Sequence, residues 1–150
     1  MSFESFLAQI KSKASELKTE ALKYKNKDFL EAAMAGSALV AYGDGTITTE
    51  EKQKMLRFIE KNDTLSVFSA DETIEKFQNF VTQLEFDKDI GEANAYKAIG
   101  KLKSNEPAAR LLVRMVISIA GSDGDFSEQE KVVARHIARE LDLDPEEFEL

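Results

Sequence analysis

The sequence contains no cysteine, which excludes disulfide bonds, thiolate nucleophiles and zinc sites built on thiolates. It has a single histidine, His136, and neither a glycine-rich dinucleotide loop nor a P-loop, so the usual residues of redox or hydrolytic enzymes are missing. No apolar run reaches the roughly 18 residues of a membrane span, and the N-terminus lacks the apolar segment of a secretory signal. These absences favour a cytoplasmic protein that is not an enzyme.

Irregular structure should also be scarce, because only two prolines and seven glycines occur in 150 residues. Strict alternation of apolar and polar residues is nearly absent, whereas apolar residues recur at three- and four-residue steps. We therefore expect a single all-α domain over residues 1–150. Residues 28–43 and 106–121 are the richest in apolar and small side chains, so they should form the most buried helices.

Residues 1–24 are expected to contain one amphipathic helix, from about residue 3 to residue 24. Its apolar stripe comprises Phe3, Phe6, Leu7, Ile10, Ala14, Leu17 and Ala21. The lysines of this segment lie largely off the stripe, which is compatible with a helix on a membrane surface or with a helix packed on the domain. Glu4, Glu16 and Glu20 dilute the positive charge and favour packing.

The net charge is −8, and the acidic residues are concentrated towards the C-terminus. An acidic chain is a poor candidate for binding nucleic acid, because phosphate backbones favour basic surfaces. It is a better candidate for binding cations or basic partners.

Two segments repeat the same pattern, AYGDGTITTEEK at 41–52 and AGSDGDFSEQEK at 120–131. They are offset by 79 residues, from Ala41 to Ala120, and five of their twelve positions are identical. Each follows an apolar helix and precedes an amphipathic one. We infer two helix–loop–helix halves, related by an approximate two-fold axis.

The first repeat resembles the second half of an EF-hand calcium loop. Asp44, Gly45 and Glu51 match the acidic fifth position, the glycine at six and the glutamate at twelve. However, Val40 and Tyr42 stand where the first and third oxygen ligands would be. One loop alone therefore supplies too few ligands for calcium.

The spacing of the acidic residues leaves two interpretations open. Thr48 with Glu51, and Ser127 with Glu130, fit capping boxes, so both glutamates have a structural role that needs no metal. Alternatively, the two halves bring their carboxylates together around a weakly bound calcium or magnesium ion, since these metals prefer oxygen ligands. The candidate ligands for such a site are Asp44, Glu51, Asp123 and Glu130.

Several motifs, taken in order along the chain, resemble the TerB family of bacterial tellurite-resistance operons. They are YKNK at 24–27, EEKQKM at 50–55, SVF at 66–68, FDKDIG at 86–91, SDGDF at 122–126 and LDLDPEEFEL at the C-terminus. The resemblance implies an all-α fold of about seven helices in two similar halves, and a part in the response to tellurite and related stresses.

The resemblance also implies a cation-chelating module that works near the inner membrane. Its implied partners are the integral membrane protein TerC and calcium-binding TerD-type proteins, and its implied ligands are the same four carboxylates. A rival interpretation is a helical adaptor that binds only proteins and whose Asp-Gly loops are purely structural.

Overall fold

The structure is a computed structural model that describes residues 2–43, 45–122, 124 and 126–150. Within these residues the chain forms eight α-helices and two 3₁₀ helices and has no strand, which confirms the expected all-α class. The α-helices are α1 (Phe3–Ser12), α2 (Ala14–Lys23), α3 (Lys27–Ala41), α4 (Thr49–Lys61), α5 (Ala70–Phe86), α6 (Lys88–Gly100), α7 (Glu106–Ala120) and α8 (Glu128–Glu140). The 3₁₀ helices are η1 (Thr64–Val67) and η2 (Pro145–Phe148).

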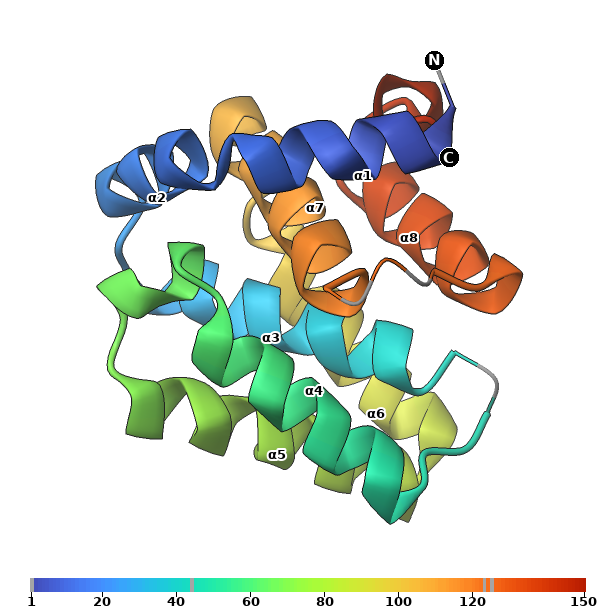
Figure 1. Ribbon diagram of the computed structural model, residues 1–150. Helices are drawn as coiled ribbons and strands as arrows, with labels where there is room; N and C mark the ends of the chain where they lie inside the picture. The colour runs from blue at the N-terminus through green and yellow to red at the C-terminus, as the bar shows by residue number, and fades with distance from the viewer. Residues whose placement is uncertain (1, 44, 123, 125) are drawn as a thin grey trace.

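Helix α3 lies at the centre of the fold, with α4, α5 and α6 on one side and α7 on the other (Figure 1). Eleven of its residues are buried, as are ten of α7, more than in any other helix of the described chain. The prediction that these two helices are the most buried is therefore confirmed. Their small and apolar side chains allow close packing from several directions.

The helices of the two halves pack against one another as the repeat predicts. The first half comprises α3, α4 and the loop between them, and the second comprises α7, α8 and their loop. Helix α3 packs against both α7 and α8, while α7 packs against both α3 and α4. Each half therefore buries its apolar helix against both helices of the other, which is the arrangement expected of two halves related by an approximate two-fold axis.

The N-terminal segment differs from the expected single helix because it bends at Lys13, between α1 and α2. Helix α1 packs on α7, whereas α2 reaches η1 as well as α7. One straight helix could not follow both surfaces, although the apolar stripe runs through the bend without interruption. Phe3, Leu7, Leu17 and Ala21 are all buried, so both helices of this segment pack with their apolar side chains inward.

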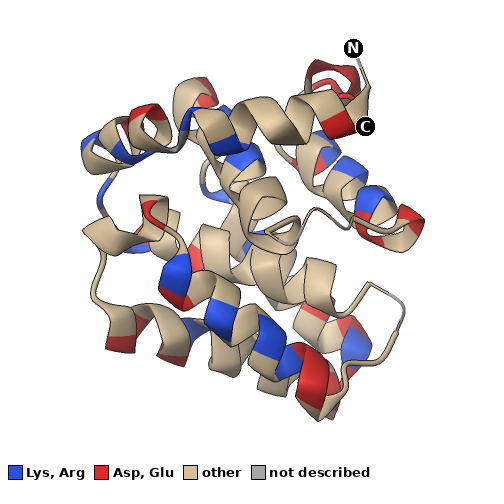
Figure 2. Ribbon diagram, in the orientation of Figure 1, with Lys and Arg blue, Asp and Glu red and all other residues tan. Residues whose placement is uncertain are grey.

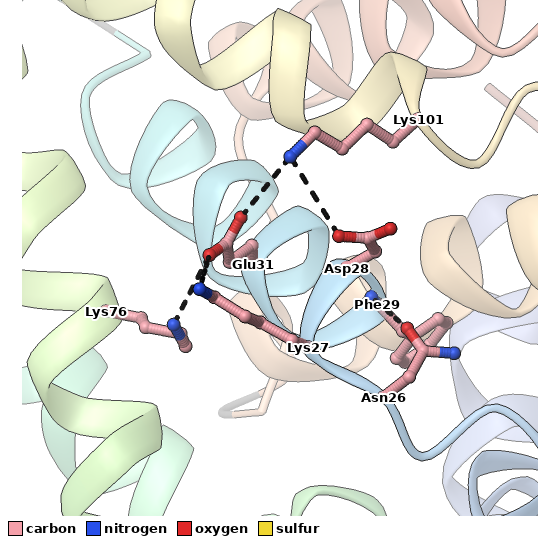
Figure 3. A network of polar contacts seen from close by, with 7 residues as sticks. All are labelled: Asn26, Lys27, Asp28, Phe29, Glu31, Lys76 and Lys101. Atoms are coloured by element: carbon pink, nitrogen blue, oxygen red, sulfur yellow. Dashed lines mark hydrogen bonds and ion pairs between the residues drawn. The ribbon is translucent and has the colours of Figure 1, made fainter.

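At the start of α3, away from the two loops, a polar network joins this helix to α5 and α6 (Figure 3). The carboxylate of Glu31 lies 3.4 Å from the ammonium of Lys76, 3.8 Å from that of Lys101 and 3.9 Å from that of Lys27. Lys101 also lies 3.9 Å from Asp28. Lys27 belongs to α3, Lys76 to α5, and Lys101 follows directly after α6, so the network links the start of α3 to both neighbouring helices.

No helix in the described part of the chain is both long enough and apolar enough to cross a lipid bilayer.

Candidate functional site

The two repeated loops share two backbone features at their described residues, a glycine with positive φ and a hydrogen bond from its amide. Gly45 has φ +92° and Gly124 has φ +82°, a left-handed conformation that glycine adopts without strain. The amide of Gly45 donates to the carbonyl of Tyr42 at 2.9 Å, and the amide of Gly124 donates to the carbonyl of Gly121 at 2.9 Å. The repeated sequence therefore encodes a repeated turn. We call residues 42–48 the first loop and residues 121–127 the second loop.

Both loops end in a side-chain cap on the helix that follows. The Thr48 hydroxyl accepts from the Glu51 amide at 3.1 Å, and the Ser127 hydroxyl accepts from the Glu130 amide at 3.2 Å. In the second loop the Glu130 carboxylate also accepts from the Ser127 amide at 2.8 Å, which completes the predicted capping box. In the first loop the Thr48 hydroxyl instead donates to the Glu51 carboxylate at 3.1 Å. The hydroxyl caps are confirmed at both helices, and the full box forms at the second.

Replacing Ser127 by alanine is expected to lower the free energy of unfolding by about 1 kcal/mol, because it removes the hydroxyl that caps α8. Thr48→Ala should have a similar effect on α4. Urea denaturation of both variants measures the loss, and Ser127→Thr is the control, since threonine retains the hydroxyl. An unchanged midpoint in Ser127→Ala would contradict the cap.

A cleft of about 290 Å³ lies between the two halves and contains residues from both repeats. Glu51 and Glu130 both line it, although they are 79 positions apart in the chain. Helices α4 and α8 both begin on the right-hand side of Figure 1, and acidic residues mark their first turns in Figure 2. The remaining lining residues are Val40, Ala41, Gly43, Lys54, Met55, Phe58, Ala120, Ser127 and Gln129.

The structure therefore brings two of the four candidate ligands to one cleft, and both glutamates are half-buried there. Asp44 and Asp123 lie outside the described residues. Among the residues that are described, no group of three or more histidine, cysteine, aspartate or glutamate side chains gathers closely enough to hold a metal ion. Of the four candidate ligands, the structure thus places Glu51 and Glu130 along one cleft.

Lys54 is a residue of the cleft that the sequence analysis did not single out. Its side chain lines the cleft with both glutamates, and its ammonium lies 5.5 Å from the ring centre of Phe58. The sequence spacing could have predicted that Lys54 lies beside Glu51, because residues three apart share a helix face and Lys54 follows Glu51 by three positions. The cleft is therefore lined by a positively charged side chain of the protein itself, as well as by the two carboxylates.

A second cleft, of about 220 Å³, lies where α6 and α8 meet the end of α3, and Tyr42, Tyr96 and His136 are among its lining residues. Burial, together with the carboxylates of Glu92 and Glu140, raises the pKa of Tyr96 to about 12. The phenol therefore stays protonated near neutral pH and does not act as a base. His136 is exposed on α8.

Comparisons with known proteins bear directly on the region that contains both loops. Residues 30–150 match the family model described as "Tellurite resistance protein TerB". A curated protein from Alcaligenes sp, named "Tellurium resistance protein TerB", is 36% identical over 115 residues, which cover 77% of this chain and 94% of the relative. No solved structure matches the chain. Helices α1 and α2 precede the matched range.

Proposed function

The chain belongs to the TerB family of tellurite resistance proteins, and on that premise we propose that it is a non-enzymatic scaffold that binds a divalent cation between its two loops. The proposed ion is calcium or magnesium, bound weakly. The proposed ligands are Asp44, Glu51, Asp123 and Glu130. The observation that carries the proposal is the shared cleft, which Glu51 and Glu130 line from opposite halves of the chain.

The chemistry of the described part of the cleft fits such an ion. Calcium and magnesium bind oxygen ligands, and the lining residues include two carboxylates, the Ser127 hydroxyl and the Gln129 amide. A carboxylate offers two oxygens with about four lone-pair positions, so the hydrogen bond that Glu51 accepts from the Thr48 hydroxyl uses only part of its capacity. A bound cation would offset the repulsion between the two carboxylates that line this cleft.

Weak affinity is expected because neither loop provides a complete ligand set. Calcium takes six to eight oxygens, whereas Val40 and Ala41 present apolar side chains in the cleft. The ammonium of Lys54 in the same cleft opposes an incoming cation through like charge. The proposed ion is thus one that exchanges readily.

The non-enzymatic part of the proposal rests on the composition and on the two clefts. The chain has no thiol to carry electrons to tellurite, and its one histidine is exposed on α8. In the first cleft the carboxylates of Glu51 and Glu130 and the hydroxyl of Ser127 all take part in helix caps, which supports a structural rather than a nucleophilic role for them.

The proposal extends to where the protein works and with what. We expect a cytoplasmic location at the inner face of the membrane, reached indirectly through a TerC-like membrane protein, with TerD-like proteins as further partners. The net charge of −8 supports binding to basic surfaces of such partners and disfavours nucleic acid.

A second candidate function is a helical adaptor that binds proteins without a metal. The observation that favours it is the capping of α4 and α8, since hydrogen bonds within the loops already engage Glu51 and Glu130. Phe86 and Ile90, which are 87% and 56% exposed at the junction of α5 and α6, offer an apolar contact for such a partner.

Thermal melts with and without millimolar calcium or magnesium distinguish the two functions. A cation that binds only the folded chain raises its stability by RT ln(1 + [L]/Kd). We expect the wild type to gain stability, and the paired variant Asp44→Asn/Asp123→Asn to lose most of that gain while folding well without metal.

The matched control is Asp63→Asn/Asp89→Asn, which changes the net charge equally at two exposed positions. This control should gain as much stability from the cation as the wild type does. General screening of the repulsion between negative charges does not depend on which aspartates are removed. If the cation raises the melting temperature equally in all three proteins, Asp44 and Asp123 are not ligands and the adaptor is favoured.

A further inference from the structure

Large apolar side chains are exposed at few places in the described chain, and most of them fall in two short segments. Phe86 at the end of α5 is 87% exposed, and Ile90 in the first turn of α6 is 56% exposed. Leu22 on α2 is also 56% exposed. These three side chains therefore mark residues 11–25 and 85–92 as surfaces on which another molecule can pack.

The two segments carry opposite charge. Residues 11–25 contain five lysines and two glutamates, a net charge of +3, although the whole chain carries −8. Residues 85–92 contain four acidic residues and one lysine, a net charge of −3. Lysines mark α2 and the chain that follows it in Figure 2. Each segment thus combines an exposed apolar contact with a charge that complements the other.

The lysines of the first segment are available to a partner. Lys18, Lys23 and Lys25 are exposed, and none forms an ion pair with a described residue. Lys18 precedes Leu22 by four positions, so the two side chains share one side of α2. We call residues 18–25 the basic face.

In the second segment some of the carboxylates already have partners. Glu85 pairs with Lys52 of α4 at 2.8 Å, and Glu92 lies 3.9 Å from Lys88. Asp89 is exposed and forms no ion pair with a described residue. We call residues 85–92 the acidic corner.

The basic face and the acidic corner lie far apart in one molecule. Helix α2 is at the upper left of Figure 1, whereas the start of α4, which Lys52 joins to Glu85 near the end of α5, is at the lower right. The two surfaces therefore do not meet within one chain, and they can meet only between two chains.

We propose that the occupant of each surface is a second copy of this chain: the basic face of one molecule docks on the acidic corner of the next, with Leu22 against Phe86 and Ile90. Because the two surfaces differ, a dimer leaves one of each free, and association continues head to tail into longer chains or rings. The surfaces are small, so the contact belongs to the weak, transient class of interfaces. It does not depend on the proposed cation site.

Sedimentation velocity of the wild type over a series of protein concentrations measures this association. We expect the average mass to rise beyond that of a dimer at high concentration. Raising the NaCl concentration from about 0.02 to about 0.5 M should weaken the association, because salt screens the attraction between the two surfaces. Stronger association at high salt would overturn the charge pairing, since salt also screens the general repulsion between chains of net charge −8.

Two variants each disable one surface. Lys18→Glu/Lys23→Glu reverses the charge of the basic face, and Phe86→Ala/Ile90→Ala removes the apolar contact of the acidic corner. All four residues are exposed, so both variants should fold as the wild type does, which circular dichroism checks. Each variant alone should self-associate at least about tenfold more weakly than the wild type.

A mixture of the two variants distinguishes a head-to-tail contact from any other. The first variant retains its acidic corner and the second retains its basic face, so the mixture should form dimers of one chain of each and nothing larger. Lys61→Glu/Lys97→Glu is the matched control, because it changes the net charge equally at two exposed lysines outside both surfaces. It should associate as the wild type does.

A wild type that stays monomeric at every concentration would overturn the inference. So would a mixture that stays monomeric where the wild type associates, or a control that loses as much association as Lys18→Glu/Lys23→Glu. If a monomeric wild type instead binds vesicles that contain phosphatidylglycerol, and Lys18→Glu/Lys23→Glu does not, the basic face contacts an anionic lipid surface and the inference is wrong.

Discussion

Replacing Gly91 by alanine is expected to destabilise the fold by about 3 kcal/mol, because α6 crosses α5 at this residue with no room for a side chain. An added Cβ would lie 2.6 Å from the Cα of Leu84 and 2.7 Å from its amide nitrogen. Both are backbone atoms in the last turn of α5, so no rotamer change relieves the overlap. The two helices would have to move apart.

Such a movement is costly because a single residue joins the two helices. Helix α5 ends at Phe86 and α6 begins at Lys88, so Asp87 both ends one and caps the other. Its carboxylate accepts from the amide of Ile90 at 3.1 Å. Separating the helices would strain this turn and loosen Leu84, which is 1% exposed.

Gly100→Ala is the matched control, since Gly100 ends the same helix. An added Cβ there meets only a carboxylate oxygen of Glu140, at 3.7 Å, which is an ordinary contact. It should leave stability within about 1 kcal/mol of the wild type, in the favourable direction, because alanine is the better helix former. Urea denaturation compares the two variants, and equal stabilities would contradict the close approach of α5 and α6.

Phe29→Ala should cost about 3–5 kcal/mol, the range for removing a fully buried phenylalanine from a core. The ring is 0% exposed. It stacks on Tyr24 with centres 6.5 Å apart and on Phe68 with centres 6.3 Å apart. These partners come from the end of α2 and from the residue after η1, so the loss would loosen three elements at once.

Phe86→Ala makes the same chemical change at a residue that is 87% exposed. It should alter stability by no more than about 0.5 kcal/mol, as surface substitutions usually do. Thermal or urea denaturation of both variants measures the difference. A loss in Phe29→Ala no larger than that in Phe86→Ala would contradict the position of Phe29 in the core.

Helices and their ends could be predicted from the sequence, because helix periodicity and capping depend on residues three or four positions apart. Ser127 caps α8, Pro107 lies in the first turn of α7, and the central helices are those with the most apolar residues. The bend at Lys13 could not be predicted in this way. The apolar stripe passes through it unbroken, and only the surfaces of α7 and η1 decide where the helix turns.

At the candidate site, three features could be predicted from the sequence. They are the two equivalent loops, their glycine turns and the caps at the start of α4 and α8. Two features of the site appear only in the folded structure. Glu51 and Glu130 line one cleft together with Lys54, and α1 packs on the second loop but not on the first. The reason is the sequence separation of the contacting residues. A cap or a turn is a contact between residues a few positions apart, so a local pattern can predict it. The cleft joins residues 79 positions apart, and the contacts of α1 with the second loop join residues more than 100 positions apart, so no local pattern predicts them.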